Sequence, residues 1–140
     1  MIERFFSDTI KELGTKEIVI YTAPIDMNYA FVTGFYISNI SDRNSNFEVY
    51  LYQKKNERKV SLASANTPLP AGSTAAIAAL GQRIQLTPGD AIYAKAGHDK
   101  VADVLISVSE VIYTEDDLKA MSLAAKANEN KNLPEELRTE

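Results

Sequence analysis

Two turn signatures of the same kind divide the middle of the chain into short segments. One reads Leu-Pro-Ala-Gly-Ser from Leu69, and the other reads Leu-Thr-Pro-Gly-Asp from Leu86. Proline presets φ for the first corner of a turn, and glycine accepts the positive φ that follows. Because short alternating apolar runs flank both signatures, the middle of the chain is predicted to be all β.

The composition is typical of one soluble domain. The 140 residues are 45% hydrophobic and 24% charged, which is enough for a single sizeable core. A formal net charge of -4 argues against general affinity for nucleic acid or for an anionic membrane. The chain has no cysteine, which excludes disulfides and thiolate chemistry and favours synthesis in the cytoplasm. Acidic residues near the start argue against a signal peptide, and no apolar run reaches transmembrane length.

Apolar residues near the start recur at spacings of four, four and three. These residues are Ile2, Phe6, Ile10 and Leu13. This spacing places them on one side of a helix, Phe5 widens the apolar stripe, and a glycine follows at position 14. We therefore expect an N-terminal helix over residues 1–14.

Strand-like runs follow as far as residue 113, and they predict an antiparallel, jelly-roll-like β-sandwich over residues 15–113. The expected strands are 16–21, 29–40, 47–52, 60–62, 74–80, 83–86, 91–95 and 104–113. The residues expected between the sheets are Val19, Phe31, Phe35, Ile37, Val49, Leu51, Ile84, Ile92, Ile106 and Val108.

A C-terminal helix plus extended arm is expected over residues 114–140. Thr114 is well placed as an N-cap, three acidic residues follow it, and Leu118 and Met121 share one face of the helix. The segment from Asn128 onward has too little apolar content to fold alone. We expect it either to be disordered or to become ordered on a partner.

The side chains that could carry chemistry do not form a recognisable site. His98 is the only histidine and is expected to be exposed in a loop, without a nucleophile motif beside it. The loop that begins at Asp42 opens like an EF-hand, but Phe47 stands where the glycine is required and Gln53 where the glutamate is required. The acidic run from Glu115 is better explained by helix capping than by a metal site. We therefore expect no enzymatic activity, no cofactor and no metal.

Tyrosines are numerous on the expected strands, and Tyr50 and Tyr52 share the solvent-leaning face of one of them. Aromatic side chains of this kind pack on sheets, dominate protein interfaces or bind sugars. The predicted interface residues are Phe5, Phe6, Tyr50, Tyr52, Leu118, Met121, Leu133 and Leu137.

The succession of strands and turns resembles a recurrent β-sandwich of tailed-bacteriophage virion proteins. The resemblance extends from Ile18 to Ile112, about two-thirds of the chain, and it rests on segments that begin at Val19, Val32, Phe47, Leu69 and Ile84. The last of them reads Ile-Gln-Leu-Thr-Pro-Gly-Asp-Ala-Ile-Tyr-Ala. Asp26 and Met27 stand where such proteins more usually have a glycine-containing turn.

The resemblance implies a non-enzymatic structural protein of the virion, made in the host cytoplasm. A capsid cement or decoration protein that binds the major capsid protein is the first expectation, and a homo-oligomer, with a trimer favoured, goes with it. A neck, tail or baseplate subunit is the alternative within this class. A small carbohydrate-binding or cupin-like module is the alternative from another class.

Overall fold

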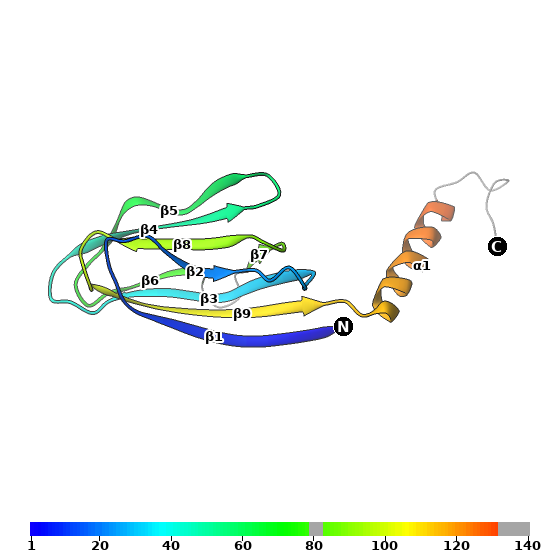
Figure 1. Ribbon diagram of the computed structural model, residues 1–140, viewed down its shortest axis with the longest axis horizontal. Helices are drawn as coiled ribbons and strands as arrows, with labels where there is room; N and C mark the ends of the chain where they lie inside the picture. Colours follow the sequence, from blue (N-terminus) through cyan, green and yellow to red (C-terminus); the bar gives the residue numbers. More distant parts are fainter. Residues whose placement is uncertain (79–82, 132–140) are drawn as a thin grey trace.

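Two antiparallel sheets face each other as a β-sandwich, and one helix projects beyond its end (Figure 1). The computed structural model describes residues 1–78 and 83–131. The strands are β1 (Ile2–Leu13), β2 (Ile18–Thr22), β3 (Tyr29–Asn39), β4 (Ser45–Gln53), β5 (Arg58–Leu69), β6 (Thr74–Ala78), β7 (Ile84–Leu86), β8 (Ala91–Ala96) and β9 (Ala102–Ile112). The helix is α1 (Glu115–Lys131).

Each sheet takes strands from distant parts of the chain. The first sheet has the order β1-β9-β3-β6, and β7 also pairs with β3. The second sheet has the order β2-β8-β4-β5. β1 and β5 are therefore terminal strands, one in each sheet, and every pair of neighbours is antiparallel. The all-β sandwich expected from the sequence is confirmed at this level.

The expected N-terminal helix is wrong, because residues 2–13 form β1. β1 pairs with β9 in an unbroken register from Ile2 to Ile10, and a bulge follows before Leu13. The spacing of four that predicted a helix also fits a strand, because four is a multiple of the strand period of two. Ile2, Phe6 and Ile10 thus lie on one face of β1.

The core between the sheets contains most of the residues expected there. Confirmed as buried are Phe35, Ile37, Val49, Leu51, Ile92, Ile106 and Val108. Phe31 and Ile84 are only half-buried, and Val19 is exposed. A register shift after Val19 buries both Ile20 and Tyr21, which leaves Val19 on the outer face opposite Tyr93.

A bulge also changes the faces of β3. Val32 pairs with Val108 and Gly34 pairs with Ser107, so Thr33 is the extra residue. Ala30 and Val32 are buried before the bulge, whereas Phe35 and Ile37 are buried after it. An extra residue reverses the inward and outward positions of a strand, which is why simple alternation placed Phe31 wrongly in the core.

The glycine of each turn has the positive φ that the sequence predicted, but proline occupies the first corner only in the second turn, because the first turn runs from Pro70 to Ser73 and has Ala71 at that corner. Gly72 has φ of +70° and Gly89 has φ of +88°, and each turn is closed by a hydrogen bond to the residue three before. Asp90 is buried at the second turn, where its carboxylate accepts hydrogen bonds from the amides of Lys54 and Thr87. This carboxylate therefore fastens the turn that precedes β8 to the end of β4.

Candidate interaction surfaces

The outer face of the second sheet carries a packed aromatic cluster. Tyr50 of β4 lies directly opposite Tyr93 of β8, and their rings stack with centroids 4.9 Å apart at 12°. Lys59 of β5 places its Nζ 4.0 Å from the centroid of the Tyr50 ring. Because β4 lies between β8 and β5, Tyr93 and Lys59 approach Tyr50 from opposite sides. The Tyr50 ring is therefore enclosed by its neighbours.

Burial and charge both act on the Tyr50 hydroxyl. Desolvation, followed by a hydrogen bond to the Glu17 carboxylate, raises the pKa of Tyr50 to about 12. Tyr52 follows on the same outer face and is half-buried, as the alternation of β4 predicted. Whether these two tyrosines contact another molecule stays a prediction.

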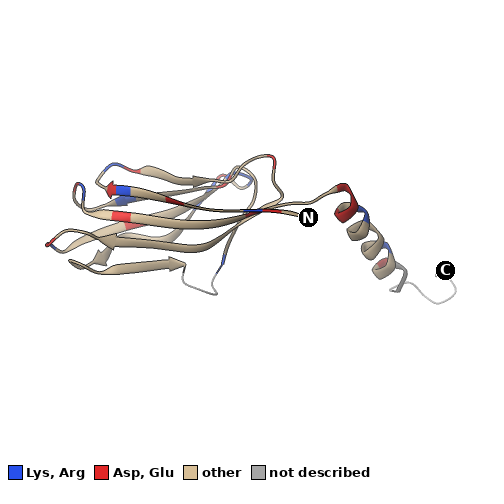
Figure 2. Cartoon of the chain, turned by 90° about the horizontal axis from the view of Figure 1, so that it is seen from below, with Lys and Arg blue, Asp and Glu red and all other residues tan. Residues whose placement is uncertain are grey.

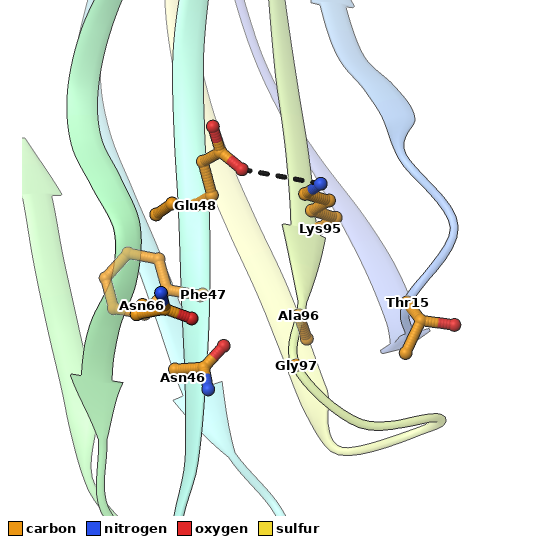
Figure 3. A pocket seen from close by; sticks show the side chains of 9 residues that line it. Thr15, Asn46, Phe47, Glu48, Asn66, Lys95, Ala96 and Gly97 are labelled. Carbon is orange, nitrogen blue, oxygen red and sulfur yellow. Dashed lines mark ion pairs between the residues drawn. The ribbon is translucent and has the colours of Figure 1, made fainter.

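A polar hollow lies farther along this sheet, between the end of β8 and an irregular part of β5 (Figure 3). Glu48 and Lys95 point toward each other there, with 3.5 Å between carboxylate oxygen and Nζ. Gly97 lies at its rim, where a Cβ would clash with the Asn46 side chain as it is placed, so a larger residue would require that side chain to move. The two charges in the hollow pair with each other, so the hollow presents a neutral, polar surface.

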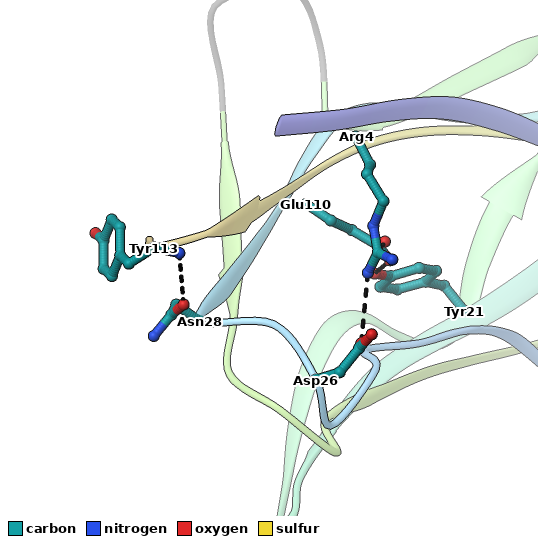
Figure 4. A network of polar contacts seen from close by, with 6 residues as sticks. All are labelled: Arg4, Tyr21, Asp26, Asn28, Glu110 and Tyr113. Atoms are coloured by element: carbon teal, nitrogen blue, oxygen red, sulfur yellow. Dashed lines mark hydrogen bonds and ion pairs between the residues drawn. The ribbon is translucent and has the colours of Figure 1, made fainter. Parts of the chain in front are cut away.

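A buried carboxylate on β9 contacts side chains of β1 and β2, and it thereby joins the two sheets (Figure 4). Glu110 of β9 is only 4% exposed, and it accepts a hydrogen bond of 2.5 Å from the Tyr21 hydroxyl. Arg4 of β1 forms an ion pair with Glu110 at 3.1 Å and a longer one with Asp26 at 3.4 Å. Burial, then the hydrogen bond to Glu110, raises the pKa of Tyr21. No sequence pattern indicates this network, because its members are far apart along the chain.

The two phenylalanines of β1 lie on opposite faces of the first sheet. Phe6 points inward and packs against Tyr21, with ring centroids 5.8 Å apart, yet it remains 40% exposed. Phe5 points outward and is 73% exposed. Both are therefore available to another molecule, although Phe6 also contributes to packing beneath β1.

The helix α1 begins at the cap that its sequence predicted. The Thr114 hydroxyl accepts a hydrogen bond from the Asp117 amide, and the Asp117 carboxylate accepts one from the Thr114 amide. The amino group of Met1 also contacts the Asp117 carboxylate at 2.5 Å, which joins the start of β1 to the start of α1. A hydrogen bond to that amino group, with those to Thr114, lowers the pKa of Asp117 to about 2.

The body of α1 stands away from the sandwich in both views (Figure 1 and Figure 2). Leu118 and Met121 are about half exposed, and Leu123 on another face is more exposed still. Leu133 and Leu137, the other predicted interface residues, lie outside the described residues. The described part of α1 thus presents apolar side chains to solvent instead of packing them on the sandwich.

Two of the side chains considered for catalysis or metal binding have structural partners. His98 is half-buried rather than fully exposed, and its Nδ1 lies 2.7 Å from the Ser45 hydroxyl. Asn44, in the loop that resembles an EF-hand, accepts a hydrogen bond from the Ala71 amide. Within residues 1–78 and 83–131, no group of three or more acidic, histidine or cysteine side chains is arranged to hold a metal ion. In the same residues, no helix is both long and apolar enough to cross a bilayer.

Comparisons with known proteins give only distant structural neighbours. No family model and no curated protein matches the sequence. A chain from the disulfide-linked pili of Bacillus endospore appendages has a TM-score of 0.47 and 8% identity, over 80% of this chain and 88% of that chain. A chain of the T13 particle of IBDV has a TM-score of 0.48 and 13% identity, over 79% of this chain and 31% of that chain.

A third neighbour, the D431N VP2 protein of infectious bursal disease virus, has a TM-score of 0.34 and 9% identity. The match covers 91% of this chain and 48% of that chain. This chain thus spans less than half of the length of the two viral chains. At such scores the likeness carries no argument about function.

Proposed function

We propose that this chain is a non-enzymatic structural subunit of a tailed-phage virion, and that it acts as a capsid cement or decoration protein. The observation that carries the proposal is the uncovered apolar surface of β1 and α1, which meet at one end of the sandwich. Phe5, Leu118 and Met121 all lie on this surface. A subunit that joins neighbours needs apolar surface outside its own core.

The physical state of α1 supports an assembly role. Most of the stability of a helix in a protein comes from packing one of its faces rather than from the intrinsic helix propensity of its residues. The side chains of α1 described up to Glu129 are exposed, apart from the half-buried Asp117 at its cap. Contact with the major capsid protein or with other copies would supply the packing that the sandwich does not.

The strand order supports the jelly-roll arrangement that goes with this proposal. β1, β3 and β9 lie in the first sheet with β6 and β7, whereas β2, β4, β5 and β8 form the second sheet. Because β6 and β7 pair with successive parts of β3, together they occupy one strand position, and each sheet has four such positions. Jelly rolls are common in capsid proteins, but they also occur in lectins and cupins. The arrangement alone therefore does not separate the virion role from the carbohydrate-binding alternative.

The tyrosine face argues against the carbohydrate-binding alternative. A sugar stacks on the open face of an aromatic ring, whereas Tyr50 has Tyr93 on one side and Lys59 on the other. A neck, tail or baseplate subunit would need the same uncovered surface as a cement protein. That alternative differs only in the position of the subunit in the particle.

The composition and location of the subunit in purified particles test the proposal. We expect the chain in stoichiometric amounts on the capsid shell, in particles purified from the phage that encodes it. Its absence from particles would overturn the virion role, and a position at the neck or tail would replace the cement role.

Deletion of residues 128–140 should weaken incorporation while leaving the thermal stability of the sandwich near that of the parent.

A substitution pair tests whether the helix surface makes the contact. Leu118→Ser combined with Met121→Ser removes apolar area from α1, and we expect it to reduce the amount of subunit on particles. Val60→Ser, at an exposed position of β5, is the matched control and should incorporate normally. Equal incorporation of both variants would show that α1 is not the contact surface.

A further inference from the structure

The outer edge of β1 is an open strand edge. β1 pairs only with β9, and among the described residues no strand covers its other side. The Val111 carbonyl accepts a hydrogen bond of 2.9 Å from the Asn28 amide, on the β3 side of β9. The main-chain N–H and C=O of Val111 therefore point toward β3 and away from β1. Glu3, which is paired with Val111 in the register, consequently points its own N–H and C=O away from β9, toward the open edge.

A second contact gives the same phase farther along the strand. The Thr9 amide donates to the Asp8 carboxylate at 2.8 Å instead of to β9. Since main-chain groups alternate in direction along a strand, and the register is unbroken from Ile2 to Ile10, the outward residues are Glu3, Phe5, Ser7 and Thr9. This edge offers alternating donors and acceptors to a partner strand.

We infer that the partner is β1 of a second copy, antiparallel to the first and related to it by a two-fold axis at Phe6. In this register Phe5 faces Ser7 of the second copy, and Glu3 faces Thr9 of the second copy. Each residue whose main-chain groups point to the open edge is thus paired with another such residue, and the two-fold symmetry generates each pair twice. The first sheets of the two copies become one continuous sheet.

The inward side chains are complementary in the same register. Phe6 faces its own copy, Arg4 faces Asp8 of the second copy, and Ile2 faces Ile10 of the second copy. Directly opposite side chains are in contact range, so aromatic, charged and aliphatic pairs each fall on a matching partner. In the dimer the Thr9 amide donates to the second copy instead of to the Asp8 carboxylate. That carboxylate then forms an ion pair with Arg4 of the second copy.

The outward face also gains cover. Phe5 and Phe5 of the second copy become diagonal neighbours across the new pair, about 7–8 Å apart and within reach of aromatic side chains. Phe5 is otherwise the most exposed phenylalanine of the strand, at 73%. The pairing therefore uses the exposed aromatic groups on both faces of β1.

Neighbouring registers fit less well. An axis at Ser7 places Phe6 opposite Asp8 and moves Ile2 and Glu3 against the irregular segment after Ile10, where Glu12 has φ of 57°. An axis at Phe5 places Ile2 opposite Asp8 and Arg4 opposite Phe6. The axis at Ser7 also joins opposite charges, Glu3 and Lys11, but only the axis at Phe6 does so within the regular part of the strand.

Single cysteines test the register directly, because the native chain has none. Opposite residues of a non-hydrogen-bonded pair have Cα atoms about 4.5 Å apart, which a disulfide can bridge. We expect Phe6→Cys to form a covalent dimer under mild oxidation, with about tenfold more product than Phe5→Cys or Ser7→Cys. The double variant Ile2→Cys, Ile10→Cys keeps Phe6 and should form the same dimer.

Sedimentation of the purified full chain tests the pairing itself and needs no virus particle. We expect a two-fold dimer for the native chain and a monomer for Ser7→Pro. Proline there removes an outward N–H without breaking a bond to β9, and Ser7→Ala is the control that should stay dimeric. Asp8→Lys should weaken the dimer by setting like charges opposite each other, whereas Glu12→Lys, beyond the regular edge, should not.

Several results would overturn the inference. A monomeric or trimeric native chain would do so, and so would preferential crosslinking of Ser7→Cys or Phe5→Cys. A dimer that survives Ser7→Pro would place the contact on another surface. Because these measurements use the purified chain alone, their failure leaves the proposed virion role to be tested separately by particle composition.

Discussion

Phe35 and Phe5 belong to the same sheet, but their surroundings are opposite. Phe35 of β3 has no exposed surface, whereas Phe5 of β1 is 73% exposed. The same contrast separates the sandwich, which covers its own apolar side chains, from the end where β1 and α1 meet. Residues of the first kind hold the domain together, and residues of the second kind are available to hold molecules together.

The largest expected effect is on the stability of the sandwich. Phe35→Ala should lower the free energy of unfolding by about 3–5 kcal/mol, because it removes buried apolar area and leaves a cavity. Phe5→Ala should change it by less than about 0.5 kcal/mol, measured by urea unfolding at a concentration where the chain is monomeric. Similar losses for both variants would remove the distinction between the two regions.

The next effect concerns the buried carboxylate that joins the regions. Tyr21→Phe removes the hydroxyl that donates to Glu110, and it should cost about 1.5–3 kcal/mol in urea unfolding, since the acceptor is charged and buried. Tyr36→Phe removes a hydroxyl outside this network and serves as the control. An unchanged unfolding midpoint for Tyr21→Phe would show that the network does not stabilise the fold.

A smaller effect should be confined to the helix. Thr114→Ala removes the capping hydroxyl and should weaken α1 by about 1 kcal/mol, seen as a loss of helical circular dichroism. The unfolding of the sandwich should not change, because α1 packs little of its surface on it. Thr114→Ser keeps the hydroxyl and should keep the helix. A drop in the unfolding midpoint of the sandwich with Thr114→Ala would indicate that α1 belongs to the core structure.

The smallest effect is expected in alkali, at the tyrosine face. The pKa of Tyr50 is raised to about 12, so the folded state holds this proton more tightly than the unfolded state does. Its contribution is complete below about pH 10 and decreases as the pH rises toward 12. The stability difference between the native chain and Tyr50→Phe should therefore shrink over this range. A constant difference would mean that the Tyr50 hydroxyl is not held in this way.

Local chemistry explains what the sequence predicted well. The turns at Gly72 and Gly89 and the cap at Thr114 depend on residues close together in the chain, and all three were predicted. The alternation of β4 also predicted its inward and outward faces, since that strand keeps one phase along its inward side. These features need no knowledge of distant segments.

The features that were missed depend on partner strands. The spacing of apolar residues in β1 fits a helix or a strand, and only the edge of β9 decides between them. The exposure of Val19 and the change of faces in β3 follow from bulges, which exist only relative to a neighbouring strand. The contact of Arg4, Tyr21 and Glu110 likewise requires the folded sandwich.

The capped start of α1 determines direction more than distance. A helix of 17 residues spans about 25 Å, and a flexible linker of equal length has a similar root-mean-square span, about 23 Å. The linker would spread its far end through a wide volume, whereas the helix keeps it along one axis. A molecule that binds near Lys131 is therefore held in a defined direction from the sandwich as well as at a defined distance from it.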